Sequence, residues 1–358
     1  MKITEIKAEK IKLELKEPLK VAFGVVPYSE NILVKIETDE GLAGYGEGAP
    51  LPFVTGENID SAAAALQMFQ KVLTGMDVMD LEGIHSLMDR TIAGNTSVKC
   101  AVDLALYDIR GKMCGQPVYK ILGGSDGRVT NDITIGIGKP EDMAKKAKER
   151  VEKDGYRVLK IKTGISVEED IGALTKIREA VGPDIRLRVD ANQGYTVCTA
   201  QKALKAFTAL GVESAEQCLP AQDMEGAAFL RRKAPDIALM LDESIHSPKD
   251  AARAARLEAA DIFNIKLMKC GGLYPAMKIN AIGEAWGIGC MVGCMIESKL
   301  SITAGLSLAA AMKNIADADC DSFMDCKGAE NMYRGGFTHE GDRFLLNDAP
   351  GFGLDIDF

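Results

Sequence analysis

Three acidic residues recur at a constant interval in the middle of this chain. Asp190, Glu216 and Asp242 follow one another in steps of 26 residues, and each stands at the end of a short apolar run. A strand, its returning helix and two loops take roughly that many residues, so the interval predicts parallel strands in successive βα units. Acids at the carboxyl ends of neighbouring barrel strands converge on one point, which predicts a site for a hard cation.

The same interval extends beyond the three acids. Apolar or β-branched runs are centred near residues 134, 160, 188, 214, 240, 264, 290 and 318, and helical patterns such as residues 140–153 and 168–181 fill the gaps. Eight repeats of strand and crossover are the number for a closed (β/α) barrel. An open doubly wound sheet is the alternative, but no GxGxxG turn opens it.

The sequence before the repeats has a different pattern. Residues 3–15, 31–38 and 42–47 alternate as antiparallel strands do, and helical patterns follow at residues 58–73 and 98–113. We therefore expect an α+β domain over residues 1–125, a barrel over 126–325, and a glycine-rich tail over 326–358 that returns to the first domain.

Composition excludes several classes of protein. The net charge of −9, without a dense Lys/Arg block, argues against a nucleic-acid partner. No apolar run of 18 or more residues occurs and the first ten residues are charged throughout, which predicts neither a membrane span nor a signal peptide. Nine cysteines without a CxxC pair indicate free thiols in a reducing cytosol, so we expect a cytoplasmic protein.

Three lysines lie at the ends of predicted barrel strands. Lys160 and Lys162 are two residues apart on the second strand, so both point to the same side, and Lys266 ends the sixth strand. The second and sixth strands lie on opposite sides of an eight-stranded ring, with the three acids on the arc between them. The lysines therefore face each other across the predicted cation site.

This arrangement predicts a reaction at a carbon next to a carboxylate. Oxygen ligands without nearby His or Cys favour Mg²⁺, or Mn²⁺, over zinc. A substrate carboxylate becomes a doubly negative enediolate when its α-proton leaves, and a bound cation stabilises that charge. Lys162 and Lys266 would each take or return the proton on their own face, while the Lys160 cation lowers the pKa of Lys162.

Each residue also has an ordinary interpretation. A strand-end Asp often caps a helix, and a strand-end lysine is in other barrels a Schiff-base nucleophile, although that chemistry needs no acid triad. The histidines His85, His246 and His339 do not end any apolar barrel run. Acid–base chemistry therefore falls to lysine or carboxylate.

The eighth run carries further acids. Asp317, Asp319 and Asp321 alternate, so they share one face if the segment is extended. Near the barrel mouth a pair of acids suits a cationic substrate group such as a free ammonium. A solvated acidic turn is the alternative.

Together these motifs resemble the enolase superfamily, whose combination of a lysine or histidine base with Mg²⁺ is well established. The Lys160-Ile-Lys162 element, the acid triad and Lys266 resemble its muconate-lactonizing subgroup, because the mandelate racemase relatives would require a histidine base. Asp319-Cys-Asp321 and residues 290–299 resemble the dipeptide epimerases of that subgroup, such as L-Ala-D/L-Glu epimerase.

The resemblance implies an N-terminal capping domain, a modified (β/α)7β TIM-like barrel, and an isomerase that is commonly a homo-oligomer. It implies that Asp319 and Asp321 hold the α-ammonium of an L,L-dipeptide, whose C-terminal carboxylate binds Mg²⁺ and whose α-carbon is inverted. By the same analogy Lys266 deprotonates the L-configured carbon and Lys162 the D-configured one.

Two departures from the family pattern bear on the substrate. Cys218-Leu219 separates Glu216-Gln217 from Pro220, where the family has proline directly. Gly24 stands in the first capping loop where Ala-Glu epimerases carry an arginine, and Phe53 lies in an apolar second loop. We therefore expect Gly24 and Phe53 to contact an apolar second residue of the dipeptide.

Other functions remain open from the sequence. An o-succinylbenzoate synthase, a muconate cycloisomerase or an N-acylamino acid racemase would use the same scaffold on substrates without a free ammonium. A non-catalytic metal-binding barrel is a third possibility, but binding alone needs neither of the opposed lysines.

Overall fold

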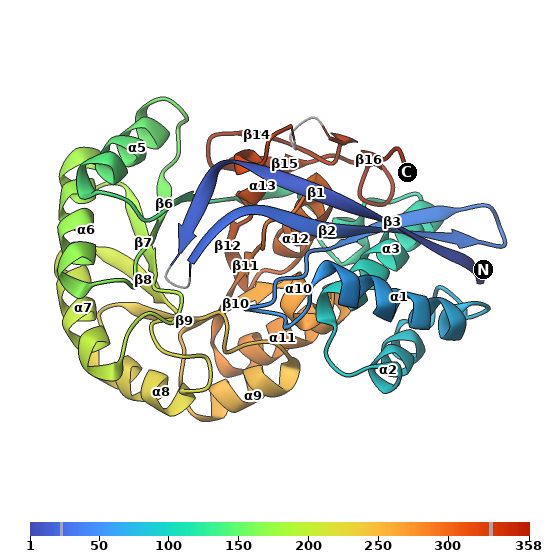
Figure 1. Ribbon diagram of the computed structural model, residues 1–358, viewed down its shortest axis with the longest axis horizontal. Coiled ribbons are helices and arrows are strands. Elements are labelled where there is room, and N and C mark those ends of the chain that lie inside the picture. The colour runs from blue at the N-terminus through green and yellow to red at the C-terminus, as the bar shows by residue number, and fades with distance from the viewer. Residues whose placement is uncertain (22–23, 329–331) are drawn as a thin grey trace.

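The computed structural model describes residues 1–21, 24–328 and 332–358. A capping domain packs against a ring of parallel strands, and a long hairpin of the capping domain crosses towards the barrel mouth (Figure 1). The hairpin belongs to an antiparallel sheet of three strands in chain order: β1 (Ile3–Val21), β2 (Gly24–Thr38) and β3 (Ala43–Gly48). The alternating segments therefore form the antiparallel strands that the sequence predicts.

Four helices complete the capping domain: α1 (Ile59–Leu73), α2 (Leu81–Thr91), α3 (Thr96–Cys114) and α4 (Val118–Ile121). Helix α1 begins at a capping box in which the Asn58 side chain accepts hydrogen bonds from the first-turn amides. Helix α3 is almost wholly buried and lies directly on β3. A Cβ at Gly46 would come within 2.0 Å of the Ala101 carbonyl, so this close approach requires glycine.

The barrel consists of eight parallel strands, each hydrogen-bonded to its neighbours in chain order. They are β5 (Ile133–Ile135), β6 (Val158–Lys162), β7 (Arg186–Asp190), β8 (Val212–Glu216), β9 (Ala238–Leu241), β10 (Ile262–Lys266), β11 (Gly289–Gly293) and β12 (Ile315–Asp319). All eight coincide with the apolar runs, which confirms the predicted fold class and excludes the open doubly wound sheet.

The ring is nearly closed between its first and last strands. Just before β5, Asn131 forms a parallel bridge with Ala318 of β12, and the Asp132 amide donates to the Ala318 carbonyl over 2.9 Å. Among the described residues after β12, the four-residue α13 (Ser322–Asp325) is the one helix, which agrees with a (β/α)7β barrel lacking a full final helix.

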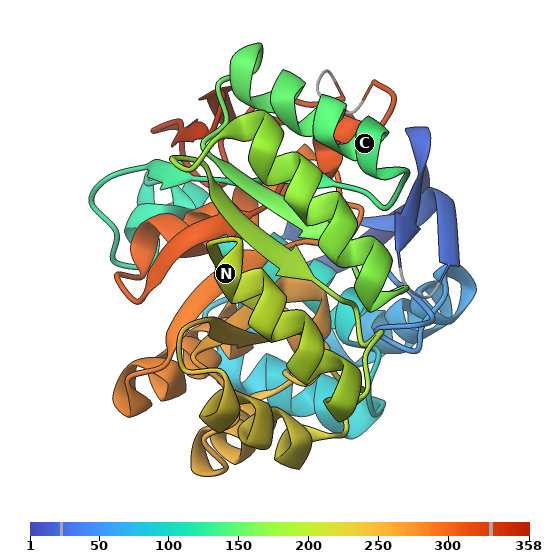
Figure 2. The same ribbon diagram turned by 90° about the vertical axis from the view of Figure 1, so that its left-hand side faces the viewer.

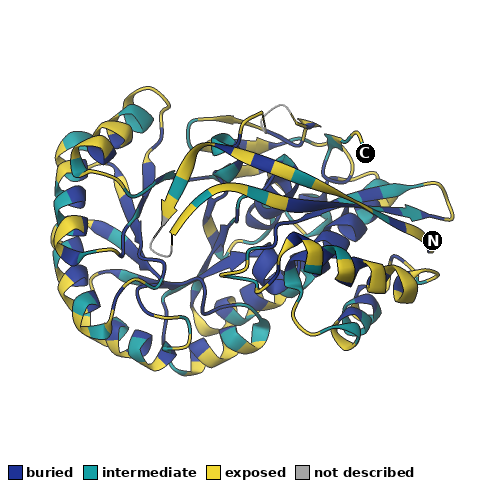
Figure 3. Cartoon of the chain, viewed as in Figure 1, coloured by how far each residue is buried: buried dark blue, intermediate teal, exposed yellow. Residues whose placement is uncertain are grey.

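Helices surround the strands (Figure 2), with their outer faces exposed and the strands buried (Figure 3). They are α5 (Pro140–Glu152), α6 (Val167–Val181), α7 (Val197–Ala209), α8 (Met224–Lys233), α9 (Pro248–Arg256), the short α10 (Leu267–Cys270), α11 (Leu273–Trp286) and α12 (Lys299–Ala311). None of the helices in the described chain has the length and apolar character needed to cross a bilayer.

The tail lies against the capping domain and the start of the barrel. It forms β13 (Arg334–Gly335), β14 (Phe337–Glu340), β15 (Arg343–Leu346) and β16 (Leu354–Asp355), and β15 pairs with β4 (Arg128–Thr130). The Phe352 amide donates to the Asp108 carboxylate of α3 over 2.9 Å. The domain boundaries at residues 125 and 325 stay predictions.

Two buried carboxylates of the capping domain lie at the first turns of barrel helices. Asp103 of α3 accepts from the Leu273 amide at the start of α11 over 2.6 Å. Glu47 of β3 accepts from the Ser298 amide before α12 over 3.0 Å. An anionic acceptor satisfies unpaired amides at a helix N-terminus and suits the positive end of the helix dipole. These contacts orient the capping domain on the barrel.

Candidate active site

Charged side chains gather at the carboxyl ends of β6 to β10. The strand register places Lys162 beside Asp190 and Asp190 beside Glu216, while Asp242 directly follows β9 and Lys266 ends β10. Parallel strands in register bring their ends to one level, which explains why residues 28 and 26 positions apart are neighbours. The structure thus brings the three predicted acids and their lysines together.

Lys160 lies at the centre of this cluster. It is 1% exposed, and its Nζ lies 2.8 Å from Glu216, 3.1 Å from Asp190 and 2.6 Å from Asp319. Burial lowers the pKa of Lys160, but the three carboxylates outweigh burial and hold that pKa well above its ordinary value. Lys160 is therefore a fixed cation.

Lys162 and Lys266 approach the cluster from strands on opposite sides of the ring. Lys162 Nζ lies 2.6 Å from Asp190 Oδ2, and Lys266 Nζ lies 2.7 Å from Asp242 Oδ2. Both side chains line the same cavity. Two amines thus flank the space above the acids, as the strand count predicts.

The acid cluster has the donor chemistry of a hard-cation site. Burial and the neighbouring Asp190 charge raise the pKa of Glu216 to about 8. Burial acts in the same direction on Asp190 and Asp242, but the adjacent lysines outweigh it and hold the pKa values of these two carboxyls below their ordinary range. Within the described residues no three acids, histidines or cysteines are spaced around one point as a bound ion requires. Lysine ammonium groups contact the acids instead, as in the Lys160–Glu216 and Lys266–Asp242 ion pairs. The oxygen-only donors nevertheless fit Mg²⁺ or Mn²⁺ better than zinc.

Further polar residues surround the acids. Lys269, fully buried in α10, donates from Nζ to Asp242 Oδ1 over 2.5 Å. The Asn264 side chain donates from Nδ2 to Glu216 Oε1 over 2.7 Å. Asn192 donates to Glu243 Oε1 over 3.3 Å, and both line the cavity. In the described part of the chain, Asn192 Oδ1 and Glu243 Oε2 are buried without a hydrogen-bond partner. These oxygens offer further acceptors to a hydrated cation.

Sequence reasoning did not identify these four residues as part of the site. Each lies within three positions of a predicted residue: Asn192 after Asp190, Glu243 after Asp242, and Lys269 after Lys266, while Asn264 precedes Lys266. Their positions next to predicted strand-end residues in the sequence were the signal that could have identified them.

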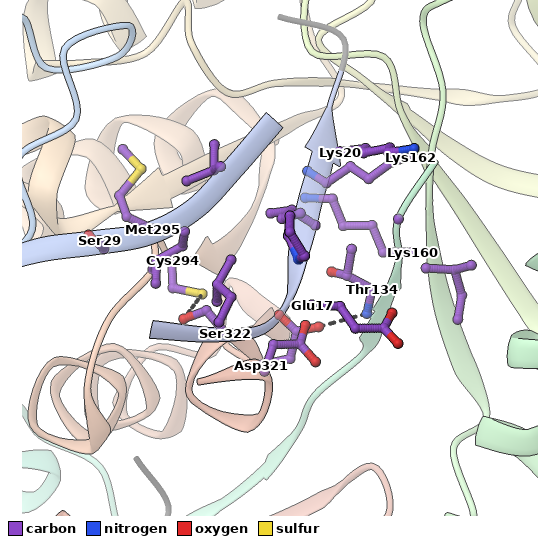
Figure 4. A pocket seen from close by; sticks show the side chains of 18 of the residues that line it. Glu17, Lys20, Ser29, Thr134, Lys160, Lys162, Cys294, Met295, Asp321 and Ser322 are labelled. Atoms are coloured by element: carbon purple, nitrogen blue, oxygen red, sulfur yellow. Dashed lines mark hydrogen bonds between the residues drawn. The ribbon is translucent and has the colours of Figure 1, made fainter. Parts of the chain in front are cut away.

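The eighth strand brings two acids to the cavity and sends a third elsewhere. Asp319 contacts Lys160, and both acids line the cavity. Asp321 accepts from the Thr134 amide over 2.6 Å (Figure 4). Burial and the Asp319 charge raise the pKa of Asp321 to about 7. Asp317 instead pairs with Arg186 and Arg188, which lie nearer the amino end of β7 than Asp190 does.

The three histidines lie apart from these groups. His85 contacts the buried Asp103 carboxylate over 2.8 Å, His246 lies in the loop before α9, and His339 stacks on Phe344. None of the three lines the cavity, within the residues that the structure describes.

The cavity is about 1040 Å³ and has an apolar wall above the charged floor. The apolar wall is formed by Leu19 of β1, Leu51 and Val54 of the loop after β3, and Met295 and Ile296 of the loop after β11. Charged residues of β1 and α5, such as Lys20 and Lys146, also line the cavity.

The two predicted capping-loop residues lie outside that wall. Phe53 is 71% exposed and is not among the lining residues, and Gly24 lies exposed at the start of β2. Ala22 and Phe23 of the first capping loop fall outside the described residues.

Comparisons with known proteins agree with this geometry. Residues 3–123 match the model of the mandelate racemase / muconate lactonizing enzyme N-terminal domain, and residues 142–358 match that of the enolase C-terminal domain-like family. A hydrophobic dipeptide epimerase of Enterococcus faecalis is 41% identical over 99% of both chains. A solved structure of a dipeptide epimerase from that organism, complexed with Mg and L-Leu-L-Tyr, has a TM-score of 0.96 at 41% identity, covering 99% of this chain and 100% of that one.

Two further relatives have other substrates. An L-Ala-D/L-Glu epimerase of Clostridium acetobutylicum is 40% identical over 99% of both chains. An N-succinyl-L-Arg/Lys racemase of Bacillus cereus is 38% identical, covering 99% of this chain and 96% of the relative. The relatives are thus racemases and epimerases of amino acid derivatives whose substrates differ.

Proposed function

We propose that this chain, which belongs to the mandelate racemase and muconate lactonizing enzyme family of the enolase superfamily, is a Mg²⁺-dependent dipeptide epimerase. It would invert the α-carbon of the C-terminal residue of an L,L-dipeptide by two-base proton transfer. The observation that carries this proposal is the placement of Lys162 and Lys266 on opposite sides of one cavity, beside a buried acid cluster.

Asp190, Glu216 and Asp242 would hold the cation, and Lys269 and Asn264 orient two of these carboxylates. When bound, the cation would stabilise the negative charge that develops on the substrate carboxylate as the α-proton leaves. Lys160 adds a fixed positive charge at the same floor. The acids and Lys160 thus prepare the site for a charge that grows during the reaction.

Proton transfer itself would fall to the two flanking lysines. One amine removes the α-proton from its face, and the opposite ammonium returns a proton to the other face. Such a step inverts the configuration without any redox partner. Lys266 would act on the L-configured carbon and Lys162 on the D-configured one.

Asp319 and Asp321 would bind the substrate's free ammonium. Lys160 already offsets part of the Asp319 charge over 2.6 Å, whereas Asp321 accepts from the neutral Thr134 amide. We therefore infer that Asp321 contributes more of the attraction for the amino terminus.

The side chain of the second residue would lie against the apolar wall. Leu19, Leu51, Val54, Met295 and Ile296 offer an apolar surface to this side chain, while the basic residues of the same cavity, such as Lys20, lie elsewhere in its lining. The name of the Enterococcus faecalis relative and the dipeptide in the related structure support an apolar preference. We propose L,L-dipeptides with an apolar C-terminal residue as substrates.

Deuterium exchange tests the proposal. A panel of L,L-dipeptides would be incubated with the enzyme and Mg²⁺ in D₂O, and mass gain and new diastereomers would be followed. We expect one deuteron and inversion at the C-terminal residue, most rapidly for apolar residues. Lys266→Ala should abolish exchange of the L,L-substrate but retain exchange, without inversion, of the L,D-diastereomer; Lys162→Ala should do the reverse. Full epimerisation by either variant would contradict the two-base assignment.

An N-acylamino acid racemase is the second candidate, because the Bacillus cereus relative is an N-succinyl amino acid racemase. The ammonium role of Asp321 separates the candidates. Asp321→Asn should reduce kcat/KM for dipeptides by about tenfold, from loss of roughly 1.4 kcal/mol of charge interaction. Equal loss on N-acylated analogues, or faster turnover of those analogues by the unaltered enzyme, would favour the racemase.

A further inference from the structure

Two cysteines lie side by side at the edge of the cavity. In the register of β11 and β12, Val292 is opposite Ala318 and Gly293 is opposite Asp319, so Cys294 and Cys320 directly follow the last paired residues of the two strands. Neighbouring strands lie roughly 4.8 Å apart. Disulfides join Cα atoms separated by about 4.4–6.8 Å. The paired strand ends therefore bring the two residues that follow them close to the separation that a disulfide spans.

The Cys320 thiol reaches back to the strand that precedes Cys294. Its Sγ donates to the Val292 carbonyl of β11 over 3.7 Å, and both cysteines are free. Side chains at paired positions of adjacent strands point to the same face of the sheet. No large movement of either strand is needed to bring the sulfur atoms together.

Only one of the pair is accessible from the cavity. Cys294 is half-buried, lines the cavity and lies 3.4 Å from the Ser322 hydroxyl (Figure 4), whereas Cys320 is 1% exposed. Contact with the Cys294 thiol, together with burial, raises the pKa of Cys320 well above its ordinary value. A small oxidant entering the cavity therefore meets Cys294 first, and Cys320 is placed to resolve the product.

We propose that Cys294 and Cys320 form a redox-modification site at which a hydroperoxide produces an intramolecular disulfide in the wall of the substrate cavity. The Cys294 sulfur attacks the peroxide, its S–H proton goes to the leaving oxygen, and a sulfenic acid and water (or an alcohol) result. The Cys320 sulfur then displaces the sulfenic hydroxyl, which leaves as water with the Cys320 proton. Two thiols are oxidised and one peroxide bond is reduced.

The disulfide would act on the ammonium-binding end of the cavity. Cys320 lies between Asp319 and Asp321, and Cys294 begins the loop that brings Met295 and Ile296 to the wall. The Cys294–Ser322 contact breaks when the sulfur turns to Cys320, and Ser322 also accepts from the Glu297 amide over 3.1 Å. We therefore expect oxidation to lower turnover and a thiol reductant to restore it.

The modification itself does not depend on the proposed reaction, so it is measured by mass and not only by activity. The full-length enzyme would be treated with hydrogen peroxide, alkylated and digested without reduction. We expect loss of two hydrogen atoms and a cross-linked peptide pair containing Cys294 and Cys320, both reversed by dithiothreitol. Cys294→Ser and Cys320→Ala should each prevent the cross-link, whereas the exposed control Cys198→Ser should not.

Each variant's oxidised turnover would be compared with its own reduced turnover. We expect a severalfold, reversible fall in the unaltered enzyme and in Cys198→Ser, and little change in Cys294→Ser or Cys320→Ala. A cross-link from Cys294 to the nearby Cys326 instead, no cross-link at all, or full turnover by the cross-linked enzyme would overturn the proposal. If no dipeptide is turned over even when reduced, the mass measurement still decides the modification.

Discussion

Removal of the Glu47 carboxylate should loosen the capping domain and alter the substrate cavity together. Glu47 is fully buried and accepts from Asn31 Nδ2 over 2.7 Å, from the Ser298 hydroxyl over 2.5 Å and from the Ser298 amide over 3.0 Å. Asn31 donates its other amide hydrogen to the Ile296 carbonyl over 2.9 Å. The carboxylate thus connects β3, the start of α12 and the cavity loop after β11.

The magnitude follows from these three bonds. A hydrogen bond to a charged group contributes about 1.5–3 kcal/mol net. Three such bonds at the lower limit give roughly 4.5 kcal/mol for Glu47→Ala, which also leaves buried donors unpaired. Glu47→Gln keeps the side-chain volume and one acceptor oxygen, so we expect the free energy of unfolding to fall by about 2 kcal/mol. In both variants Met295 and Ile296 lose their fixed position, and KM for apolar dipeptides should rise severalfold with a smaller change in kcat.

Asp103→Asn is the matched control, because Asp103 caps α11 as Glu47 caps α12 but does not contact the cavity loop. Denaturant unfolding would give the free energies of unfolding, and initial rates would give KM and kcat. Asp103→Asn should lower stability without a comparable rise in KM. The reasoning fails if the free energy of unfolding of Glu47→Ala is within about 1 kcal/mol of that of the unaltered protein. It also fails if substitutions of Glu47 and of Asp103 change KM equally.

Two further substitutions test the electrostatics of the site. Lys269→Met removes the buried ammonium that orients Asp242, so Mg²⁺ affinity measured by calorimetry should fall about 10–100-fold; unchanged affinity would exclude this role. Burial raises the pKa of Glu297 to about 8. Between about pH 4.5 and pH 8 the Glu297 carboxyl therefore stays protonated in the folded protein but loses its proton in the unfolded chain. The free energy of unfolding consequently falls as pH rises through that range. In Glu297→Gln the free energy of unfolding should fall less steeply with pH, by up to about 1.4 kcal/mol per pH unit. The same pH dependence of unfolding in this variant and in the unaltered protein would contradict the assignment.

The barrel was predictable because its signal is repeated along the chain. Strand and helix together occupy a nearly constant length, so eight apolar runs identify the fold even though no single run is distinctive. The site followed from the same repeat. Parallel strands bring their carboxyl ends to one edge, so the strand-end positions of Lys162, Asp190 and Lys266 implied their convergence before any contact was known.

Contacts between distant parts of the chain had no such signal. Glu47 and Ser298 are 251 positions apart, and Asp103 and Leu273 are 170 apart. Nothing in the local sequence distinguishes a carboxylate that caps a helix of another domain from one on a solvated surface. Such residues become visible only when the two domains are docked.

Phe53 shows the same limit in a loop. The apolar character of this loop suggested that Phe53 contacts the substrate. The amides of Val54 and Thr55 donate to the Leu51 carbonyl, so a turn is closed at this place. Leu51 and Val54 face the cavity, whereas Phe53 lies in the middle of the turn and is exposed. Turn geometry, which hydrophobicity does not encode, decides which apolar side chain reaches the site.

The reacting groups and the apolar wall are held in place by different parts of the structure. This difference explains how relatives that share one fold are named for different substrates. Lys162, Asp190 and Glu216 stand on strands that hydrogen-bond directly to one another, so their mutual geometry is set by the sheet. Leu19, Leu51 and Met295 come from three segments that are far apart in the chain and meet only through the docking of the capping domain. A substitution in the wall therefore changes which side chain fits without moving an acid or a base. Selectivity can diverge while the proton-transfer geometry stays fixed.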